Sequence, residues 1–424
     1  MHFCYRFTGA LVLSAFLFLS PVWGGGIFLY EQGTPDVGRA NAGTAAIASD
    51  ASTAGKNPAG MARLERSQLM TAIQPLLVRL KFDADPETTN AGGNGGDAGD
   101  LVMAASLFYV HNVTPDLKLG ISAGSYFGLG VDYGNNWAGR YYVLDAELLT
   151  MGINPVLAYR LTDWLSIGGG FSIIKADLLQ RTAINNILPF LADGQIKVED
   201  DDIGYGGNVG VLIEPGEGTR FGLTYRSEVD LDFKDAASLR RTGPLINAAL
   251  RRSGLAGSSA DMGMTIPQAF MFSGYHDLTD RLAIMGNIGW QENSAFGKTQ
   301  VSIASQTSRS FTADRNLNDT WHFAVGMTYR IRTPWLFSAG FAYDTSAVDR
   351  VDRTPDLAVD RQYRYGTGLH YDWNEDVTLG FAYEHLDAGD AAINRYRGPL
   401  AGRLVGDYKT NEVHFFAFNL NWKF

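Results

Sequence analysis

Cysteine is nearly absent from this 424-residue chain, and its one cysteine, Cys4, lies in the first few residues. We expect Cys4 to be removed with the segment that contains it, so the mature chain has no thiol for disulfides, nucleophilic catalysis or metal binding. Charged residues are also sparse, at 19% of the chain, and their balance is acidic, with a formal net charge of −10. This acidity argues against a nucleic-acid partner, because the phosphate backbone attracts basic surfaces.

Long apolar runs are scarce as well. A helical membrane protein needs repeated runs of about 20 apolar residues, and this chain has one such stretch, at 7–23 after Arg6. The run is short, it contains Pro21, and glycines follow it. We interpret residues 1–24 as a secretory signal peptide, and a signal anchor is the alternative that the helix breakers disfavour.

Catalytic and metal-binding motifs are missing too. The seven histidines stand as isolated residues without the spacing of metal-binding helices, and no serine and histidine form a legible nucleophile and base. We therefore predict that the chain is not an enzyme, that it has no catalytic residues, and that it uses neither a cofactor nor a metal.

Glycine and aromatic residues are abundant, with 49 Gly, 24 Phe, 19 Tyr and 8 Trp. From Ser67 onward, apolar residues recur with a period of two, which is typical of strands. In residues 321–331, for example, one face carries six large apolar side chains, and the other carries small and polar residues such as His322 and Gly326. Each strand thus has one apolar face and one small or polar face.

The connections between strands alternate in length. We count fourteen strands, which begin near Ser67, Asp100, Asp116, Tyr142, Trp164, Lys197, Thr219, Gly263, Arg281, Arg309, Trp335, Val359, Asp376 and Val405. Tight turns such as 113–115 alternate with long polar loops such as 83–99. Short turns at one rim and long loops at the other are typical of outer-membrane barrels, whereas a soluble sandwich has no reason to sort its loops in this way. We predict an all-β fold, a 14-stranded antiparallel transmembrane β-barrel.

Residues 25–66 lack the period of two and are rich in Ala, Gly, Ser and Asp. Asn57 followed by Pro58 is typical of a helix N-cap and the first helical residue. The segment is either a periplasmic tail or a plug, and a 14-stranded barrel is too wide for its own side chains to fill, which favours a plug. The predicted domains are a signal peptide at 1–24, an N-terminal hatch in the lumen at 25–66 and the barrel at 67–424.

Several segments have a recognisable pattern: GGIFLYEQG at 25–33, GRANAG at 38–43, NPAGM at 57–61 and WAGRY at 137–141. Together they resemble the FadL/TodX family of outer-membrane long-chain fatty acid and hydrocarbon transporters, and the likeness covers essentially the whole mature chain. The resemblance implies that extracellular loops capture the substrate, which passes to a pocket beside the hatch and leaves sideways through an inward kink in the third strand.

The third strand of this chain spans 116–132. Gly124, Gly128 and Gly130 supply the backbone freedom that a kink or bulge requires. Family members often have a proline in this stretch, where this chain has Tyr126, Phe127, Gly128 and Leu129.

The resemblance also suggests roles for hatch residues. Asn57, Pro58 and Ala59 are expected to contact the third-strand kink as part of the gate, and Ile27 and Phe28 are expected to line the ligand pocket. Asp344 lies on the polar, lumen-facing side of its strand. We expect it to bond the hatch backbone or Arg39, and ordinary solvation in the lumen is the alternative.

Two extracellular loops, 178–196 and 236–262, carry exposed apolar residues of the kind that bind ligands. The residues that we predict to form the capture groove are Leu188, Phe190, Leu245, Ile246 and Leu250. Two loop helices that pack only on each other are the alternative. Arginines at 240–241 and 251–252 flank the second loop, and they suit either a carboxylate head group or lipopolysaccharide phosphates.

These observations predict a passive outer-membrane uptake channel for a hydrophobic small molecule, first of all a long-chain fatty acid. An uptake channel for aromatic or alkane hydrocarbons and a less selective porin are the alternatives. The expected partners are outer-membrane lipid, lipopolysaccharide and the barrel assembly machinery, which would recognise the C-terminal aromatic pattern ending at Phe424. We expect a monomer.

Overall fold

The computed structural model describes residues 35–125, 128–188, 190–234, 237–252, 259–304 and 309–424. The predicted signal peptide at 1–24 and the predicted pocket residues Ile27 and Phe28 lie outside the described residues.

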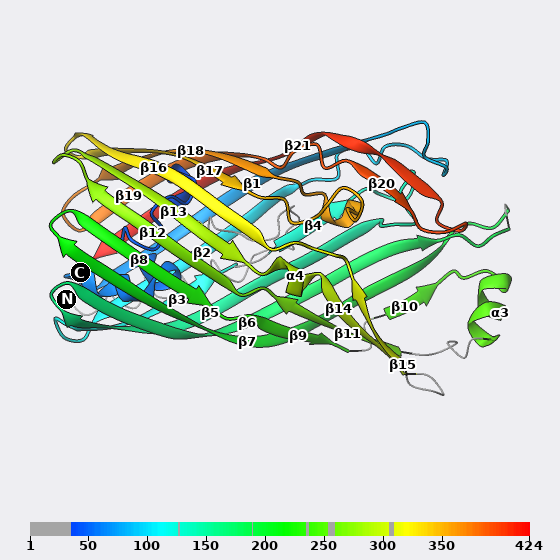
Figure 1. Ribbon diagram of the computed structural model, residues 1–424, viewed down its shortest axis with the longest axis horizontal. Helices are drawn as coiled ribbons and strands as arrows, with labels where there is room; N and C mark the ends of the chain where they lie inside the picture. Colours follow the sequence, from blue (N-terminus) through cyan, green and yellow to red (C-terminus); the bar gives the residue numbers. More distant parts are fainter. Residues whose placement is uncertain (1–34, 126–127, 189, 235–236, 253–258, 305–308) are drawn as a thin grey trace, which may run out of the picture.

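Fourteen antiparallel strands close into a barrel (Figure 1), which confirms the predicted fold class. The wall strands are β1 (Gln68–Ala84), β2 (Leu101–Asn112), β3 (Leu117–Gly124) with its continuation β4 (Gly128–Asp132), β5 (Asp145–Thr162), β6 (Leu165–Ile184), β7 (Gly194–Gly216), β8 (Thr219–Arg226), β12 (Ala269–Asp277), β13 (Leu282–Gln291), β16 (Thr320–Arg332), β17 (Trp335–Asp344), β18 (Gln362–Asp372), β19 (Val377–Asp387) and β21 (Arg403–Lys423). The first and last strands close the ring, with register from Gln68↔Lys423 to Ala84↔Gly406.

The two rims of the barrel differ as the loop lengths predict. Tight turns join β2 to β3, β5 to β6 and β18 to β19 at the rim where the C-terminus lies (Figure 1). The long loops extend from the opposite rim and carry α3 (Pro244–Arg252), α4 (Asn293–Phe296), η4 (Pro355–Leu357), β10 (Ala237–Arg240) and β20 (Ile393–Tyr396). No helix in the described part of the chain is long and apolar enough to cross a membrane.

A second, smaller sheet stands among the long loops. It contains β9 (Val229–Phe233), β11 (Ser259–Ile266), β14 (Lys298–Ala304) and β15 (Arg309–Asp314), in the order β15-β14-β11-β9. Two predicted wall-strand starts, Gly263 and Arg309, therefore fall in this sheet, and the corresponding wall strands begin later, with β12 and β16. Pro267 separates β11 from β12, because proline has no N–H for the ladder.

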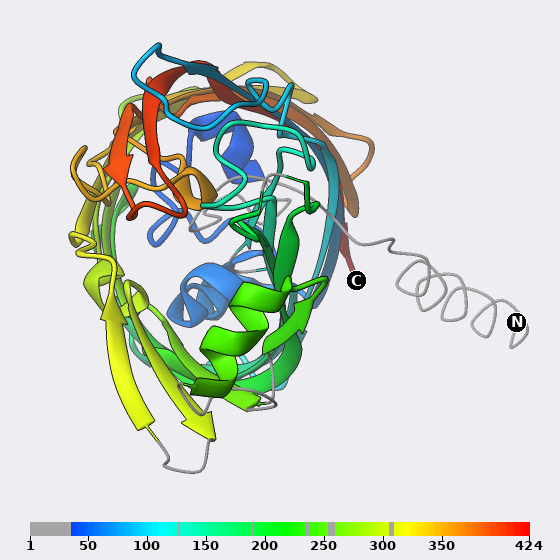
Figure 2. The same cartoon turned by 90° about the vertical axis from the view of Figure 1, so that its right-hand side faces the viewer.

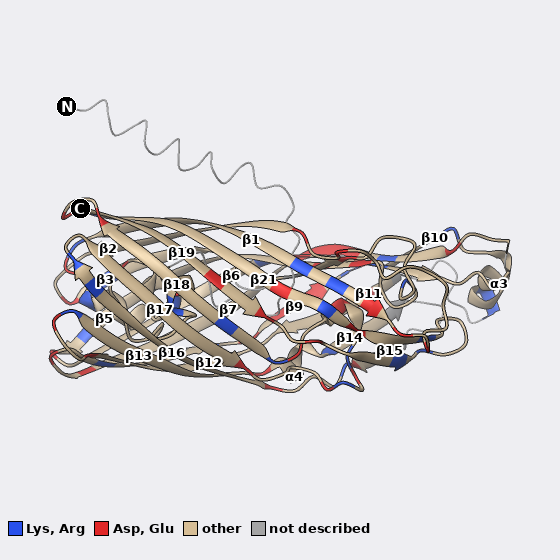
Figure 3. Ribbon diagram, turned by 90° about the horizontal axis from the view of Figure 1, so that it is seen from above, with Lys and Arg blue, Asp and Glu red and all other residues tan. Residues whose placement is uncertain are grey.

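The wall strands expose their apolar faces outward. On β16 the alternating residues Trp321, Phe323, Val325, Met327, Tyr329 and Ile331 are 38–63% exposed. Between them, His322 and Ala324 are buried toward the lumen. Charged residues gather mainly at the two ends and in the loops, and most of the strand length is uncharged (Figure 3). An apolar outer band of this kind matches a lipid environment.

The described part of the N-terminal segment, residues 35–66, lies inside the ring of strands (Figure 2). It contains three short helices, η2 (Pro35–Arg39), α2 (Thr53–Lys56) and η3 (Pro58–Arg63). Most of its side chains are buried, including charged Asp36 and Arg39. The segment fills lumen space that the wall's own side chains leave open.

Candidate functional site

Glycines of the wall make room for the N-terminal segment. A Cβ atom added at Gly210, Gly222 or Gly340 would overlap atoms of Asn57, Ala45 or Arg39, respectively. At Gly222 and Gly340 the overlapped atoms belong to the backbone of the segment, which cannot rotate away. The small residues that the sequence places on the lumen face of the strands therefore allow the backbone of the segment to approach the wall closely.

Asn57 joins the segment to the wall. Its side chain is fully buried, and its amide nitrogen donates to the carbonyl oxygens of Ala45 at 2.6 Å and of Val211, on β7, at 3.0 Å. Its Oδ1 atom accepts from the Ala59 N–H at 3.1 Å, so Asn57 caps η3 with Pro58 as the first helical residue, as the sequence predicts.

The segment meets the third strand through residues on either side of this cap. Gly55 packs against Ser122 of β3 and Phe108 of β2, and the Met61 sulfur packs against Gly120 of β3. The backbone at Pro58 and Ala59 instead packs against Gly168 of β6. The predicted gate role of Asn57, Pro58 and Ala59 remains a prediction.

The third strand is interrupted at the predicted position. β3 pairs with β5 up to Gly124↔Gly152, and β4 resumes at Gly128↔Leu149. The pairing register thus shifts by one residue, because Gly124 and Gly128 are four positions apart in the sequence and their partners Gly152 and Leu149 are three apart. One extra residue on one strand is the defining property of a β-bulge.

The interruption coincides with a break in the wall. β3 pairs with β2 up to Ala123↔Leu107. Within the described residues, β4 pairs only with β5, and the remaining part of β2, from Leu101 to Ser106, pairs only with β1. The Asp132 N–H donates to the Ala98 carbonyl at 3.0 Å and bounds the break on the side of the long loops. A stretch without strand pairing therefore lies between β2 and β4.

Asp344 does not bond Arg39, so that expectation is wrong. Its Oδ1 lies 2.7 Å from Nδ1 of His322, and its Oδ2 accepts from Nε of Arg364 at 2.9 Å. All three residues stand at neighbouring lumen positions of adjacent strands, which brings their side chains within reach of one another. Arg39 forms its ion pair inside the segment, with Asp36 at 2.6 Å.

The two predicted capture loops lie side by side at the long-loop rim. The Asn186 side chain joins them, because Oδ1 accepts from the Gly243 N–H at 2.7 Å and Nδ2 donates to the Arg241 carbonyl at 3.0 Å. Phe190 is 80% exposed and Leu245 is 45% exposed, while Leu188, Ile246 and Leu250 are partly exposed. Residues 185–193 form no helix in their described part, so two packed loop helices do not occur there, and α3 projects from the rim (Figure 1).

A buried aromatic cluster lies above the break, and sequence reasoning gave it no role. Tyr133 stacks on Trp137 with ring centroids 4.0 Å apart, and its hydroxyl donates to the Pro355 carbonyl at 2.8 Å and bonds the Tyr408 hydroxyl. Burial raises the pKa of the Tyr133 phenol well above its usual range. Of the residues in this cluster, Trp137 belongs to the family-like segment 137–141. The cluster connects the loop after β4 to η4 through Pro355 and to β21 through Tyr408.

A closed barrel with an apolar outer band, an occupied lumen and an interrupted third strand defines a plugged outer-membrane transport barrel. Residues 16–424 match the family described as outer membrane protein transport protein (OMPP1/FadL/TodX), and the chain belongs to this family. It is an outer-membrane protein and not an enzyme, as the sequence predicts.

The similarity to individual relatives and to solved structures also extends over nearly the whole chain. The chain is 28% identical to the long-chain fatty acid transport protein of Salmonella typhi, over 98% of both chains. It is 27% identical to outer membrane protein P1 of Haemophilus influenzae, over 99% of this chain and all of that protein. The fold is similar to a Pseudomonas aeruginosa FadL homologue, with a TM-score of 0.83 at 22% identity, over 96% of this chain and 99% of that chain. It is also similar to the Ralstonia pickettii toluene transporter TbuX, with a TM-score of 0.65 at 17% identity, over 91% and 98%.

Proposed function

We propose that this transporter of hydrophobic compounds takes up long-chain fatty acids by lateral diffusion. The substrate binds the apolar loop surface around Phe190 and Leu245, enters the lumen, and reaches a pocket beside the hatch that includes Ile27 and Phe28. It then leaves through the break between β2 and β4 into the bilayer. This route keeps an apolar molecule away from the polar lipopolysaccharide layer.

The break in strand pairing is the observation that carries the proposal. A β-barrel normally pairs every strand with both neighbours, because an unpaired edge in a membrane leaves backbone groups without partners. A lateral exit is the simplest explanation for a barrel wall in which β2 and β4 do not pair. Gly124, Gly128 and Gly130, which flank or follow the bulge, are the residues that we propose shape the exit.

The interior above the hatch suits an apolar solute. A buried cluster joins the inner faces of β5 and β6 to α4 and η4 and includes Leu148, Ile174, Phe296, Leu317 and Leu357. A porin that conducts polar solutes needs a hydrated constriction instead. The apolar cluster and the segment inside the lumen therefore favour a hydrophobic substrate over the porin alternative.

The charge at the capture surface favours a fatty acid over a bare hydrocarbon. Helix α3 carries Leu245, Ile246 and Leu250 and ends with Arg251 and Arg252. A guanidinium pairs well with a carboxylate, whereas toluene or an alkane gains nothing from it. We expect the double change Arg251→Gln and Arg252→Gln to weaken oleate binding several-fold and to leave toluene binding unchanged. Equal effects on both ligands would contradict the assignment to fatty acids.

Removal of one residue tests the exit. Deleting Ser125 leaves two residues opposite the two of β5, so β3 and β4 can run on without a bulge and pair with β2. We expect uptake of radiolabelled oleate by cells to fall at least tenfold, while the barrel still folds, as judged by heat-modifiable migration in gels.

A deletion of the same size elsewhere serves as the control. Gly398 lies in the turn between β20 and β21, at the long-loop rim, where an added Cβ would meet nothing. Its deletion should leave oleate uptake intact. Normal oleate uptake by cells that carry the folded Ser125 deletion variant would refute the lateral route.

We further infer the processing and assembly of the chain. Residues 1–24 are removed on export, residues 25–66 act as the hatch, and the barrel assembly machinery inserts the protein as a monomer in contact with lipopolysaccharide. Mass spectrometry of the mature N-terminus and light scattering of the detergent-solubilised protein test these statements.

A further inference from the structure

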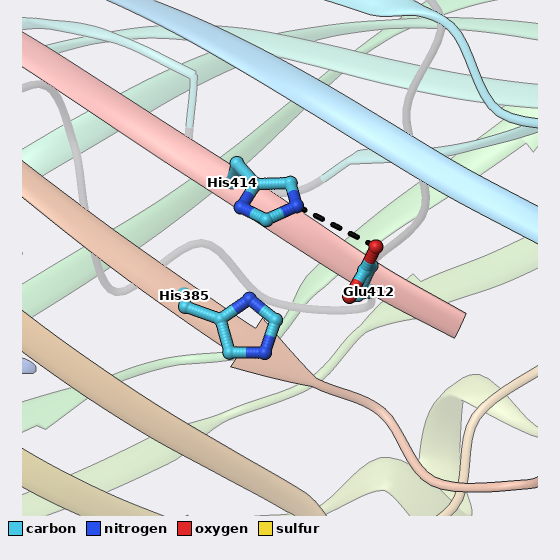
Figure 4. A group of neighbouring side chains, drawn as sticks. All are labelled: His385, Glu412 and His414. Atoms are coloured by element: carbon cyan, nitrogen blue, oxygen red, sulfur yellow. Dashed lines mark ion pairs between the residues drawn. The ribbon is translucent and has the colours of Figure 1, made fainter. Parts of the chain in front are cut away.

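Two histidines and a glutamate meet on the outer wall of the barrel (Figure 4). His385 lies on β19, and Glu412 and His414 lie on β21. The strand register places His385 directly opposite His414, with ring centroids 5.1 Å apart. One ligand atom of each residue lies within 4.8 Å of the other two, and Nε2 of His414 is 3.5 Å from Oε1 of Glu412.

This grouping is invisible in the linear sequence. His385 and His414 belong to different strands, and the spacing rules for metal sites search along one helix or one loop. Antiparallel pairing, not sequence spacing, creates the cluster.

A tyrosine next to the cluster orients one imidazole. The Tyr383 hydroxyl lies 2.8 Å from Nδ1 of His414. When Nδ1–H donates to that hydroxyl, the lone pair is on Nε2, which is the nitrogen that faces Glu412. A hydrogen bond from the second ring nitrogen is the usual support of a metal-bound histidine.

The arginine opposite Glu412 pairs with another carboxylate and does not compete with the histidines for Glu412. Arg79 stands opposite Glu412 in the β1–β21 register. Its ion pair is with Asp97, at 3.7 Å. Glu412 is the carboxylate residue of this three-residue group, 3.5 Å from Nε2 of His414, and it supplies the anionic oxygen of the set.

The donor set fits zinc. Two imidazoles and one carboxylate with an open fourth position form a common Zn²⁺ site, whereas Ca²⁺ and Mg²⁺ prefer oxygen ligands alone. Ligands about 2.1 Å from a tetrahedral ion are about 3.4 Å apart, close to the 3.5 Å between His414 and Glu412. Small side-chain rotations would bring His385 to the same distance.

The height of the cluster places it at the edge of the membrane. Toward the rim with the tight turns, the residues that follow His414 on the same face of β21 are Phe416, Phe418, Leu420 and Trp422. The eight residue-to-residue steps from His414 to Trp422 span about 20 Å along the membrane normal at a tilt of about 40°, against an apolar band about 25 Å tall. Water or a lipid phosphate can therefore supply the fourth ligand.

We propose that His385, His414 and Glu412 bind one divalent transition-metal ion, with Zn²⁺ as the chemical type, at the outer boundary of the apolar band. The bound ion cross-links β19 and β21, next to the pairing of β1 with β21 that closes the barrel. It is separate from the break between β2 and β4 and does not depend on the proposed substrate.

The test uses the full mature protein, purified in detergent without a histidine tag and stripped with EDTA. Calorimetric titration with Zn²⁺ should show one saturable site of micromolar or tighter affinity, and Co²⁺ should give the absorption bands of a tetrahedral complex. His385→Ala and His414→Ala should each weaken binding at least tenfold, and Glu412→Gln should weaken it while keeping the side-chain shape.

His111→Ala is the matched control, because His111 is exposed on the outer face, next to Tyr109, and belongs to no group of three or more possible metal ligands among the described residues. This variant should bind Zn²⁺ like the unchanged protein. The proposal fails if no saturable site is found, if His385→Ala binds as tightly as the original, or if His111→Ala loses the ion. Heat-modifiable migration in gels verifies that each variant is a folded barrel.

Discussion

Replacing Asn57 by alanine should loosen the N-terminal segment from the barrel wall. The side chain is fully buried and makes three hydrogen bonds, two as donor to Ala45 and Val211 and one as acceptor from Ala59. Alanine removes all three and leaves two buried carbonyl groups without this donor. At about 1 kcal/mol for each bond, the expected loss is about 3 kcal/mol. This corresponds to about a hundredfold change in the equilibrium between seated and released segment.

Amide hydrogen exchange measured by mass spectrometry follows the release directly. Peptides within 35–66 should lose about a hundredfold in protection in Asn57→Ala, while peptides of β13 and β16 should keep theirs. Asn57→Ser retains an acceptor for the η3 cap but loses the two donated bonds, so it should fall between the two proteins.

Asn374→Ala is the surface control for this experiment. The Asn374 side chain, like that of Asn57, bonds backbone groups, since it accepts from two N–H groups, but it lies exposed in the turn between β18 and β19. Its replacement should not change exchange in the N-terminal segment. If Asn57→Ala leaves protection of 35–66 unchanged, the attachment of the segment through this side chain is refuted.

Three further perturbations have defined outcomes. Gly340→Ala should unseat the segment, because the new Cβ overlaps the Arg39 backbone, and proteolysis should cut 35–66 faster than in Gly216→Ala, where a Cβ meets nothing. Burial raises the pKa of Tyr133, so the neutral phenol stabilises the folded loop below pH 10, the phenol's ordinary value, and this contribution is lost as the pH rises further. Tyr133→Phe should therefore flatten the fall of thermal stability above pH 10. Deletion of residues 25–61 should raise ion conductance in planar bilayers well above that of the intact protein, whereas a porin would already conduct with the segment present.

The barrel could be predicted from the sequence because its signals are local. Alternation of large and small residues, as in 321–331, fixes which face of a strand meets lipid, and the alternation of loop lengths fixes the strand number. The N-cap at Asn57 could also be predicted, since an Asn-Pro pair sets helix geometry by itself.

The parts that could not be predicted depend on contacts between distant strands. Asp344 was expected to bond Arg39, but the register of β16, β17 and β18 delivers His322 and Arg364 to it first. The same limitation hid the pairing of His385 with His414. The predicted wall-strand starts at Gly263 and Arg309 fall instead in β11 and β15 of the small sheet, because alternation alone does not tell which neighbour a strand pairs with.

The bulge in the third strand has a genetic consequence. Gly124 and Gly128 are separated by one residue more than Gly152 and Leu149, the positions opposite them. On the lateral route proposed above, a single in-frame codon separates a sealed wall from a wall with a side exit, and the strands on both sides keep their register. On that route, one three-nucleotide insertion or deletion is enough for a barrel lineage to gain or lose lateral release, with no redesign of its core.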